Sequence, residues 1–395
     1  MRSRRWWNTA AVVAASAGLC AMQGITGQSA PPAGHTRDGG KDGPVEARTR
    51  TVALNTTVDG TFAALGSRDT EPFSMLGVTW ARPSAVVAGA VEFRARDAET
   101  EVWSDWRELD VGSGPGEDGA ARGGTDPAWV GPSDGVEVRV NGDNAAPLPT
   151  GLRLDMIDPG GTDAGTGTDA GTGTDAGTGV DAPAAEQPPI VSRADWGADE
   201  SISPEKPSYL PGGKVKAAVV HHTAESNDYT CTEAPAVVRG VYTYHVKQLG
   251  WKDIGYNFLA DKCGTVYEGR KGGVDRAVLG AHAYGFNSET TGISILGTYT
   301  DAAPPNEALT SVARLAGWKL GLDGVDPAGT AVLTAGAAGK NHAGKSWAKG
   351  ARLRFPAIHG HRDGYNTECP GDALYGQLPT IRSWAAGRAT APALP

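Results

Sequence analysis

The chain of 395 residues carries a formal net charge of −9, and 39% of its residues are hydrophobic. Its length exceeds that of one ordinary core, which predicts two folded domains with connecting or processed segments. Residues 1–189 hold 15 basic and 26 acidic side chains, whereas residues 190–395 hold 21 and 19. Neither half has the strongly basic balance of a nucleic-acid-binding protein, so that class is excluded.

The first thirty residues have the pattern of an export signal. Arginines, among them the pair Arg4-Arg5, precede an apolar run from about Thr9 to Met22, and small residues follow. This pattern predicts a signal peptide that is cleaved after Ala21 or Ala30, by either the general secretory or the twin-arginine route. Neither this run nor any later segment is long and apolar enough to span a bilayer. We therefore expect a secreted, extracellular or cell-wall-associated protein without stable membrane insertion.

Residues 162–179 are three copies of Thr-Asp-Ala-Gly-Thr-Gly. Such a segment buries almost no apolar surface and is typical of a flexible, mildly acidic linker. A calcium-binding repeat is the alternative, but the glycine-and-hydrophobic period of a β-helix turn is missing. The expected organisation is a signal peptide (1–30), a disordered segment (31–47), a first domain (48–157), the linker (158–189), a second domain (190–385) and a tail (386–395).

Short alternating runs, such as Val91–Arg96 and Val136–Val140, occur between residues 48 and 157. Alternation with turn residues between the runs predicts an all-β domain, with a sandwich as the expected form. Its tryptophans could line a glycan-binding surface or pack in the core and at the edges. The sequence leaves the role of this domain open. The tryptophans concerned are Trp80, Trp103, Trp106 and Trp129.

The pattern after the linker is mixed. An apolar strand from Val215 to Val220 leads into His221-His222, and further strands are expected at 256–260 and 292–297. Helices are expected at about 234–249 and 306–320, and residues 336–350 resemble an inserted loop or hairpin. Strands interleaved with helices predict an α/β domain in which helices flank a mixed central sheet.

Three cysteines follow the signal region: Cys231, Cys263 and Cys369. Cys231 and Cys263 fall in neighbouring elements of one domain and can pair in an oxidising compartment. Closing a loop of roughly thirty residues contributes on the order of 3 kcal/mol. Cys369 is then an odd thiol, and zinc ligation would give it a partner.

Histidine and cysteine residues with metal-ligand character occur at two places, the His221-His222 pair and the segment Gly360–Gly371 with His361 and Cys369. Two His and one Cys leave a tetrahedral zinc ion one open position, as a water-activating site requires. Adjacent strand residues face opposite ways, so only one histidine of the pair can join the site. His359 remains a rival ligand because it lies two residues from His361.

Several ordered blocks make residues 190–385 resemble the peptidoglycan recognition protein family and the related phage-type zinc amidases. The resemblance does not extend to residues 1–189. The blocks are Ser192–Ala198, Val219–Ala224, Trp251–Phe258, Tyr267–Arg270, Gly280–His282, Gly360–Asp363 and Cys369–Gly371. By resemblance, the Zn²⁺ ligands are His221, His361 and Cys369, the residues beside the metal are Tyr256 and Thr367, and the substrate contacts are His282, Asn257 and Arg270.

The resemblance implies hydrolysis of the amide bond between N-acetylmuramic acid and L-alanine in peptidoglycan. Zinc would polarise the carbonyl and activate water. Tyr256 would orient the water or the oxyanion, and Thr367 would donate a hydrogen bond to the developing charge. The alternative is a non-catalytic peptidoglycan recognition module, but such members typically lack the metal cysteine. A zinc peptidase of the His-Glu-x-x-His type is disfavoured because the motif is absent.

Other polar residues have simpler expected roles. His245 is expected to pack against Trp251, and His342 is expected to be solvated. Asp363 is either a partner of a ligand histidine or a helix cap. The sequence carries no information on oligomeric state.

Overall fold

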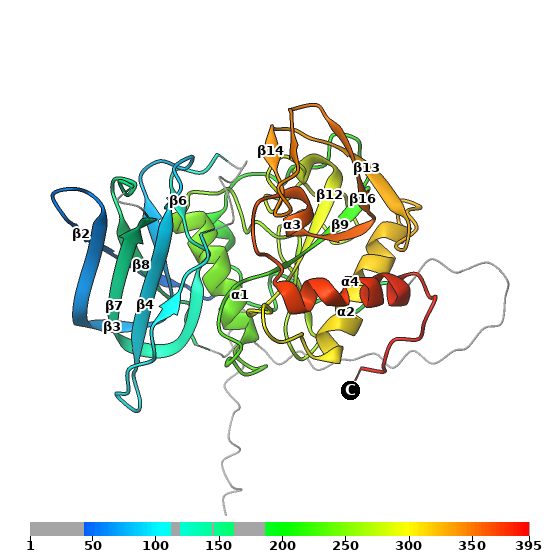
Figure 1. Ribbon diagram of the computed structural model, residues 1–395. Helices are drawn as coiled ribbons and strands as arrows, with labels where there is room; N and C mark the ends of the chain where they lie inside the picture. The colour runs from blue at the N-terminus through cyan, green and yellow to red at the C-terminus, as the bar shows by residue number, and fades with distance from the viewer. Residues whose placement is uncertain (1–42, 112–118, 144–145, 162–185, 395) are drawn as a thin grey trace, which may run out of the picture. The chain divides into compact units, whose positions relative to one another are not determined.

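The computed structural model describes residues 43–111, 119–143, 146–161 and 186–394 (Figure 1). The expected signal peptide and the repeats of the linker lie outside these ranges. Within them, no helix has the length and apolar character needed to cross a membrane.

The N-terminal domain is all-β, as predicted. Its strands form one antiparallel sheet in the order β1-β8-β3-β7-β4-β5, with β2 and β6 also paired to β3. The 19-residue strand β3 pairs with β7 along most of its length and with β8 near its end, and irregularities within its pairing to β7 bend it. The strands are β1 (Arg48–Ala53), β2 (Asn55–Thr56), β3 (Phe62–Trp80), β4 (Gly89–Asp97), β5 (Arg107–Glu108), β6 (Gly123–Gly124), β7 (Ala128–Gly142) and β8 (Arg153–Asp158).

Two of the four tryptophans of this domain lie in apolar cores, and the other two contact an arginine. Trp80 and Trp129 are only 3% and 4% exposed and lie in apolar clusters. The guanidinium of Arg94 lies 5.1 Å from the ring centroid of Trp103 and 5.3 Å from that of Trp106. Core packing therefore accounts for Trp80 and Trp129, and cation–π contacts hold the rings of Trp103 and Trp106.

The C-terminal domain is built on a five-stranded mixed sheet in the order β11-β10-β12-β9-β17. Strand β11 is antiparallel to β10, and the other neighbours are parallel. This confirms the α/β prediction. The sheet strands are β9 (Ala217–His222), β10 (Phe258–Ala260), β11 (Val266–Glu268), β12 (Thr290–Ile295) and β17 (Ile358–Gly360).

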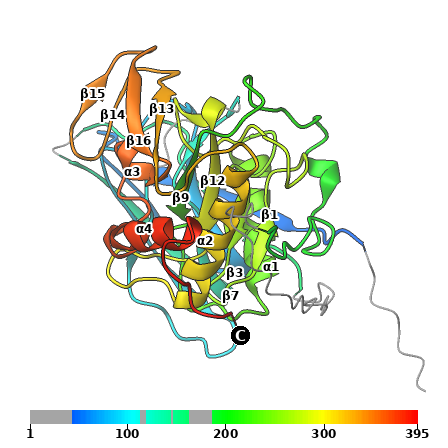
Figure 2. The same ribbon diagram turned by 90° about the vertical axis from the view of Figure 1, so that its right-hand side faces the viewer.

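Helices cover both faces of this sheet (Figures 1 and 2). Val220 and Ile293 point into the apolar cluster shared with α2 and α4, whereas Leu259 belongs to the cluster that contains α1. Strand alternation therefore gives each face its own core. The helices are α1 (Ala234–Thr243), continued by a π-helical turn η3 (Tyr244–Gln248), α2 (Asn306–Gly321), α3 (His361–Gly364) and α4 (Asp372–Ala385), with 3₁₀ turns η2 (Glu200–Ile202) and η4 (Asn287–Glu289).

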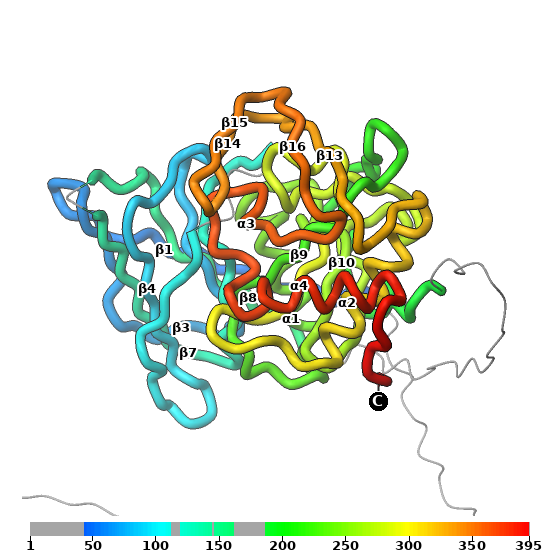
Figure 3. The backbone as a smooth tube through the Cα atoms, turned by 45° about the vertical axis from the view of Figure 1, so that its right-hand side comes forward, coloured from blue at the N-terminus to red at the C-terminus, as the bar shows by residue number. Residues whose placement is uncertain are grey.

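The expected insertion forms a hairpin inside a longer hairpin. Strands β13 (Thr330–Thr334) and β16 (Arg352–Pro356) pair, and β14 (Gly339–Lys340) and β15 (Ser346–Trp347) pair between them. The inner hairpin lies beside α3 (Figure 3). The backbone N–H of His342, between β14 and β15, donates to the carbonyl of Arg362 in α3 at 3.2 Å. The insertion is therefore tied to the segment that carries His361.

All the described residues belong to one compact unit. Arg239 of α1 donates to the carbonyls of Pro159 at 3.0 Å, Gly161 at 2.7 Å and Trp196 at 2.7 Å. Its buried guanidinium thus joins the end of the β domain to the start of the C-terminal domain. Charge-assisted hydrogen bonds of this kind are among the stronger ones in proteins.

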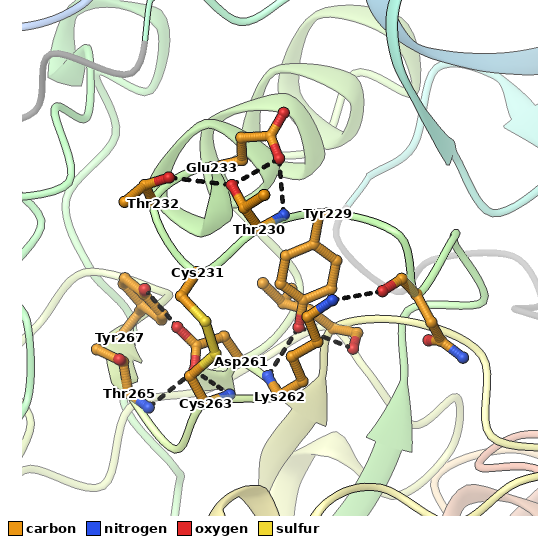
Figure 4. Close-up of a disulfide and its surroundings, with 12 residues drawn as sticks. Tyr229, Thr230, Cys231, Thr232, Glu233, Asp261, Lys262, Cys263, Thr265 and Tyr267 are labelled. Atoms are coloured by element: carbon orange, nitrogen blue, oxygen red, sulfur yellow. Dashed lines mark hydrogen bonds between the residues drawn. A yellow bond between two sulfur atoms is a disulfide. The ribbon is translucent and has the colours of Figure 1, made fainter. Parts of the chain in front are cut away.

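Cys231 and Cys263 form the predicted disulfide, which joins the segment before α1 to the turn after β10 (Figure 4). Asp261 organises this turn by accepting from the backbone N–H groups of Cys263 and Thr265, each at 2.9 Å. Its other oxygen accepts from the Tyr267 hydroxyl at 2.8 Å. The crosslink therefore closes on a turn that is already held in place.

Replacing both disulfide cysteines by serine should lower the free energy of unfolding by about 3 kcal/mol, because the 32-residue separation is no longer closed in the unfolded chain. The measurement is a urea titration followed by circular dichroism. Reductant should lower the midpoint of the parent protein but leave the double variant unchanged. Equal midpoints for the two oxidised proteins would contradict the prediction.

Candidate metal centre

The parallel pairing of β9 with β17 brings two histidines together. Val220 lies opposite Gly360 in the register, so the next residues, His221 and His361, emerge side by side where the two strands end. Their ring centroids are 4.6 Å apart. Cys369 follows in the loop between α3 and α4, and its Sγ lies 3.7 Å from Nδ1 of His221.

These three side chains fit a zinc ion. One ligand atom from each lies within 4.8 Å of the others, and all three residues are buried. In a tetrahedral zinc site, a nitrogen and a sulfur ligand are separated by about 3.6 Å, close to the observed 3.7 Å. Nε2 of His361 is buried and has no hydrogen-bond partner among the described residues. This donor set leaves one coordination position open.

Burial sets the protonation states that a metal needs. It lowers the pKa of His221 well below its usual value, and nearby His361 adds to the effect. Burial likewise lowers the pKa of His361 to about 3, so both imidazoles are neutral and can offer a lone pair. It raises the pKa of the Cys369 thiol well above its usual value. A thiolate at this position therefore requires a cation beside it.

His282 contacts the candidate ligand His221. Its Nδ1 lies 3.1 Å from Nε2 of His221, whose other ring nitrogen faces Cys369. The His282 ring lies against Gly292 on β12, where an added Cβ would come within 2.4 Å of it. His282 therefore holds the ring of His221 in place, and its substrate contact stays a prediction. The sequence did not indicate this contact, because His282 lies in a loop far from His221 in the chain.

Tyr256 and Thr367 lie beside the cluster, and their catalytic roles stay predictions. The ring centroid of Tyr256 is 5.3 Å from that of His221, and burial raises the pKa of its hydroxyl well above the usual value. The Thr367 hydroxyl accepts from the backbone N–H of Cys369 at 3.1 Å. Both hydroxyls thus keep a proton that they can donate.

Asn257 and Arg270 serve the framework of the site. The Asn257 amide donates to the Val278 carbonyl at 2.9 Å and accepts from the Gly292 N–H at 2.8 Å. Arg270 donates to the carbonyl of Ile254 at 2.8 Å and is buried. Substrate contact by either residue stays a prediction.

The rival histidine is not part of the cluster. Nδ1 of His359 lies 3.0 Å from the Pro356 carbonyl, and its ring stacks on Phe355. His222 points to the other face of the sheet, where its Nδ1 accepts from the Tyr299 N–H at 3.2 Å. The alternation argument for choosing one histidine of the pair therefore agrees with the structure.

The remaining polar residues have structural contacts. Asp363 caps α3 by accepting from the Gly360 N–H at 3.0 Å, which confirms the cap interpretation. His245 stacks on Trp251 with a centroid distance of 4.4 Å, as expected. Tyr365, which the sequence analysis missed, stacks on His361 at 5.6 Å. Only its position inside the last motif could have indicated this contact.

Replacing His282 by alanine should weaken zinc binding by roughly 10- to 100-fold, because His221 loses the group that orients its ring. Competition with a chromophoric chelator measures the affinity. His342→Ala is the matched control, since this histidine is partly exposed and lies outside the cluster. Unchanged affinity in His282→Ala would exclude the positioning role.

Two families match the chain. The family described as N-acetylmuramoyl-L-alanine amidase matches residues 211–372, and the Rv3811 N-terminal galactose-binding domain-like family matches residues 36–169. A solved structure, wild-type Drosophila PGRP-LB, is 27% identical and covers 50% of this chain and 95% of its own, with a TM-score of 0.37.

Three relatives extend the comparison. Peptidoglycan-recognition protein SC2 of Drosophila simulans is 34% identical over 200 residues, which are 50% of this chain and 88% of the relative. Peptidoglycan recognition protein 1 of Bos taurus is 35% identical over 187 residues, 47% of this chain and 80% of the relative. The human N-acetylmuramoyl-L-alanine amidase is 33% identical over 201 residues, which cover 28% of its length. Because the chain is 34% and 35% identical to the first two relatives and covers 88% and 80% of their lengths, it belongs to the peptidoglycan recognition protein family.

Proposed function

We propose that this protein is a zinc-dependent amidase that hydrolyses the bond between N-acetylmuramic acid and L-alanine in peptidoglycan. The observation that carries the proposal is the buried cluster of His221, His361 and Cys369, with ligand atoms within 4.8 Å of one another. The similarity to the human amidase supports the same reaction. Zn²⁺ is the proposed cofactor and peptidoglycan the proposed substrate.

The second candidate function is recognition of peptidoglycan without cleavage. Cys369 argues against it, because a buried thiol whose pKa is raised by burial has no evident role in a pure binding groove. The other candidate ligands also have the neutral form that metal binding requires. Hydrolysis therefore accounts for more of the site than recognition does.

The side chains around the cluster have separate proposed roles. When bound, zinc supplies a Lewis acid that polarises the amide carbonyl and activates water. Tyr256 retains its proton and orients the water or the developing oxyanion. Thr367 is held by the Cys369 N–H and donates its own proton in a hydrogen bond to the developing negative charge. His282 keeps His221 oriented through the ring nitrogen that faces away from Cys369.

We also infer two domains and a location outside the cell. The β domain at 48–157 and the amidase domain at 190–385 would act outside the cell after removal of residues 1–30. Secretion accords with the disulfide, since such bonds persist in oxidising compartments.

Cys369→Ala and His361→Ala should each lower turnover by roughly 10³-fold, because loss of the Lewis acid removes several kcal/mol of transition-state stabilisation. Mass spectrometry of digested peptidoglycan provides the assay. The parent protein should release stem peptides with a free alanine amino terminus and leave the glycan chains intact. His342→Ala should retain activity. Unaltered wall material with the zinc-loaded parent would support recognition instead.

Removing zinc with a chelator should abolish release of stem peptides, and adding Zn²⁺ back should restore it, because the proposed water activation needs the ion. The same mass-spectrometric assay follows both steps. Full activity of protein shown by elemental analysis to be metal-free would exclude the metal mechanism.

A further inference from the structure

The inserted hairpin between Thr330 and Pro356, the basic hairpin, differs in charge from the rest of the chain. The chain as a whole carries a net charge of −9, but this hairpin contains five lysines and arginines and no aspartate or glutamate. Solubility is served by both signs of charge in mixture, so it does not explain a hairpin of one sign. The five basic residues are Lys340, Lys345, Lys349, Arg352 and Arg354.

The apolar side chains of the basic hairpin pack against the loop that carries His282. Trp347 and Phe355 each lie edge-on to Phe286, with ring centroids 5.7 and 5.2 Å apart. Phe286 follows His282 by four residues in the same loop. Buried aromatic contacts of this kind fix the hairpin to the body of the domain. Its basic side chains therefore extend from an anchored structure.

The five basic side chains are exposed and have no carboxylate partners. No ion pair among the described residues includes any of them. Arg354 donates to a neutral group, the Thr330 hydroxyl, at 3.1 Å. The β domain differs, since Arg139 on β7 pairs with Glu92 on β4 at 2.8 Å. The cations of the basic hairpin thus remain available to an anion from outside.

Two carboxylates contact the basic hairpin, but at other atoms. Glu289 accepts from the backbone N–H of Thr334 at 2.6 Å and pairs with Lys216. Glu368 lies 3.5 Å from Nδ1 of His342. Neither carboxylate forms an ion pair with the five basic side chains, so the hairpin keeps its excess of positive charge.

The tip of the basic hairpin is attached to the segment that carries a candidate zinc ligand (Figures 1 and 3). Nδ2 of Asn341 donates to the Asp363 carbonyl at 3.3 Å, and the His342 N–H donates to the Arg362 carbonyl at 3.2 Å. Both acceptors lie in α3, which begins with His361. A polymer bound at the candidate metal centre would therefore have a fixed cationic neighbour.

We propose that the basic hairpin binds the carboxylates of stem peptides that neighbour the one at the metal centre, on the same peptidoglycan chain. This inference rests on the proposed amidase function and names the form of substrate that the site prefers. The hairpin provides a second contact with the polymer. The protein therefore favours polymeric peptidoglycan over a fragment with a single stem peptide.

The chemistry of peptidoglycan matches such a contact. A peptide with a free carboxyl end is negatively charged at neutral pH, because the pKa of an α-carboxyl group is about 3.5. Stem peptides repeat this charge along the glycan chain. Once one stem peptide is bound, contact with the next becomes intramolecular and raises the overall affinity. A fragment with one stem peptide has no second anion to offer.

A variant that combines Lys340→Gln, Lys345→Gln and Lys349→Gln should bind insoluble peptidoglycan about tenfold more weakly, because each exposed ion pair contributes modestly. Cosedimentation of the zinc-loaded protein on ice measures the dissociation constant without relying on turnover. High salt should remove most of the difference from the parent, since exposed charges are screened. Equal dissociation constants of this triple variant and the parent at low salt would overturn the inference.

The matched control combines Arg68→Gln, Lys206→Gln and Lys214→Gln. These three residues are also exposed, lie outside the basic hairpin, and change the net charge by the same amount. The control should bind like the parent. Equal weakening by both combinations would reveal a general effect of net charge and would contradict a role of the hairpin. Zinc content and thermal melting of both variants should match those of the parent.

Two treatments of the peptidoglycan identify the anion. Converting its carboxyl groups to neutral amides with a carbodiimide and methylamine should reduce binding of the parent to that of the triple variant. Removing phosphate-containing wall polymers with hydrofluoric acid should preserve the difference between the two proteins. Full binding of the parent to amidated material, or loss of the difference after hydrofluoric acid, would overturn the assignment to stem-peptide carboxylates.

Kinetics test the preference for polymer. The triple variant should raise KM for polymeric peptidoglycan roughly tenfold with kcat nearly unchanged, because it loses binding that is equal in the ground and transition states. Its KM and kcat for a fragment with one stem peptide should equal those of the parent. A structural defect would alter both substrates, so the same change in KM for polymer and fragment would contradict the inference.

The binding and kinetic measurements separate this inference from the proposed function. If the parent protein releases no stem peptides, the amidase proposal fails, and cosedimentation still decides whether the basic hairpin binds peptidoglycan carboxylates. If the parent and the triple variant cleave polymer with the same KM, the amidase proposal stands and the role of the hairpin is excluded.

Discussion

A buried thiolate is stable only beside a positive charge, and this constraint organises the candidate site. Cys369 is enclosed with two imidazoles that burial keeps neutral, so neither histidine can supply that charge. A metal ion can, and the three side chains have the spacing to hold one. The parallel pairing of β9 with β17 makes this spacing possible, because His221 near the end of β9 lies beside His361, which directly follows β17.

The residues around the cluster hold the candidate ligands in position. Gly292 leaves room for the His282 ring, and that ring reaches the nitrogen of His221 that faces away from Cys369. Thr367 holds the backbone N–H of Cys369. The residues that orient a zinc ligand also determine how well it binds the metal. Replacing such an orienting residue therefore lowers metal affinity even though the ligand itself is unchanged.

Much of the candidate metal centre could be predicted from the sequence, because the choice of its residues depends on local sequence pattern. The odd cysteine count separated Cys369 from the Cys231–Cys263 disulfide, and alternation along β9 separated His221 from His222. The contact between His282 and His221 could not be predicted, since it joins a loop to a strand 61 residues away. Met75 and Trp129 alternate like any buried strand residues, so nothing in their pattern indicated a shared core with the second domain.

The three carbonyls bound by Arg239 have a consequence for how the chain can change in length. Gly161, the last described residue before the repeats, is anchored to α1, and Val191 on the far side is anchored by its N–H to the Val266 carbonyl. Both attachment points therefore belong to the same folded body. The entropic cost of joining two fixed points by a loop rises only with the logarithm of the loop length. Gain or loss of a hexapeptide copy during evolution would leave the candidate metal centre untouched, and the same stretch is a natural place to insert a reporter or an affinity handle.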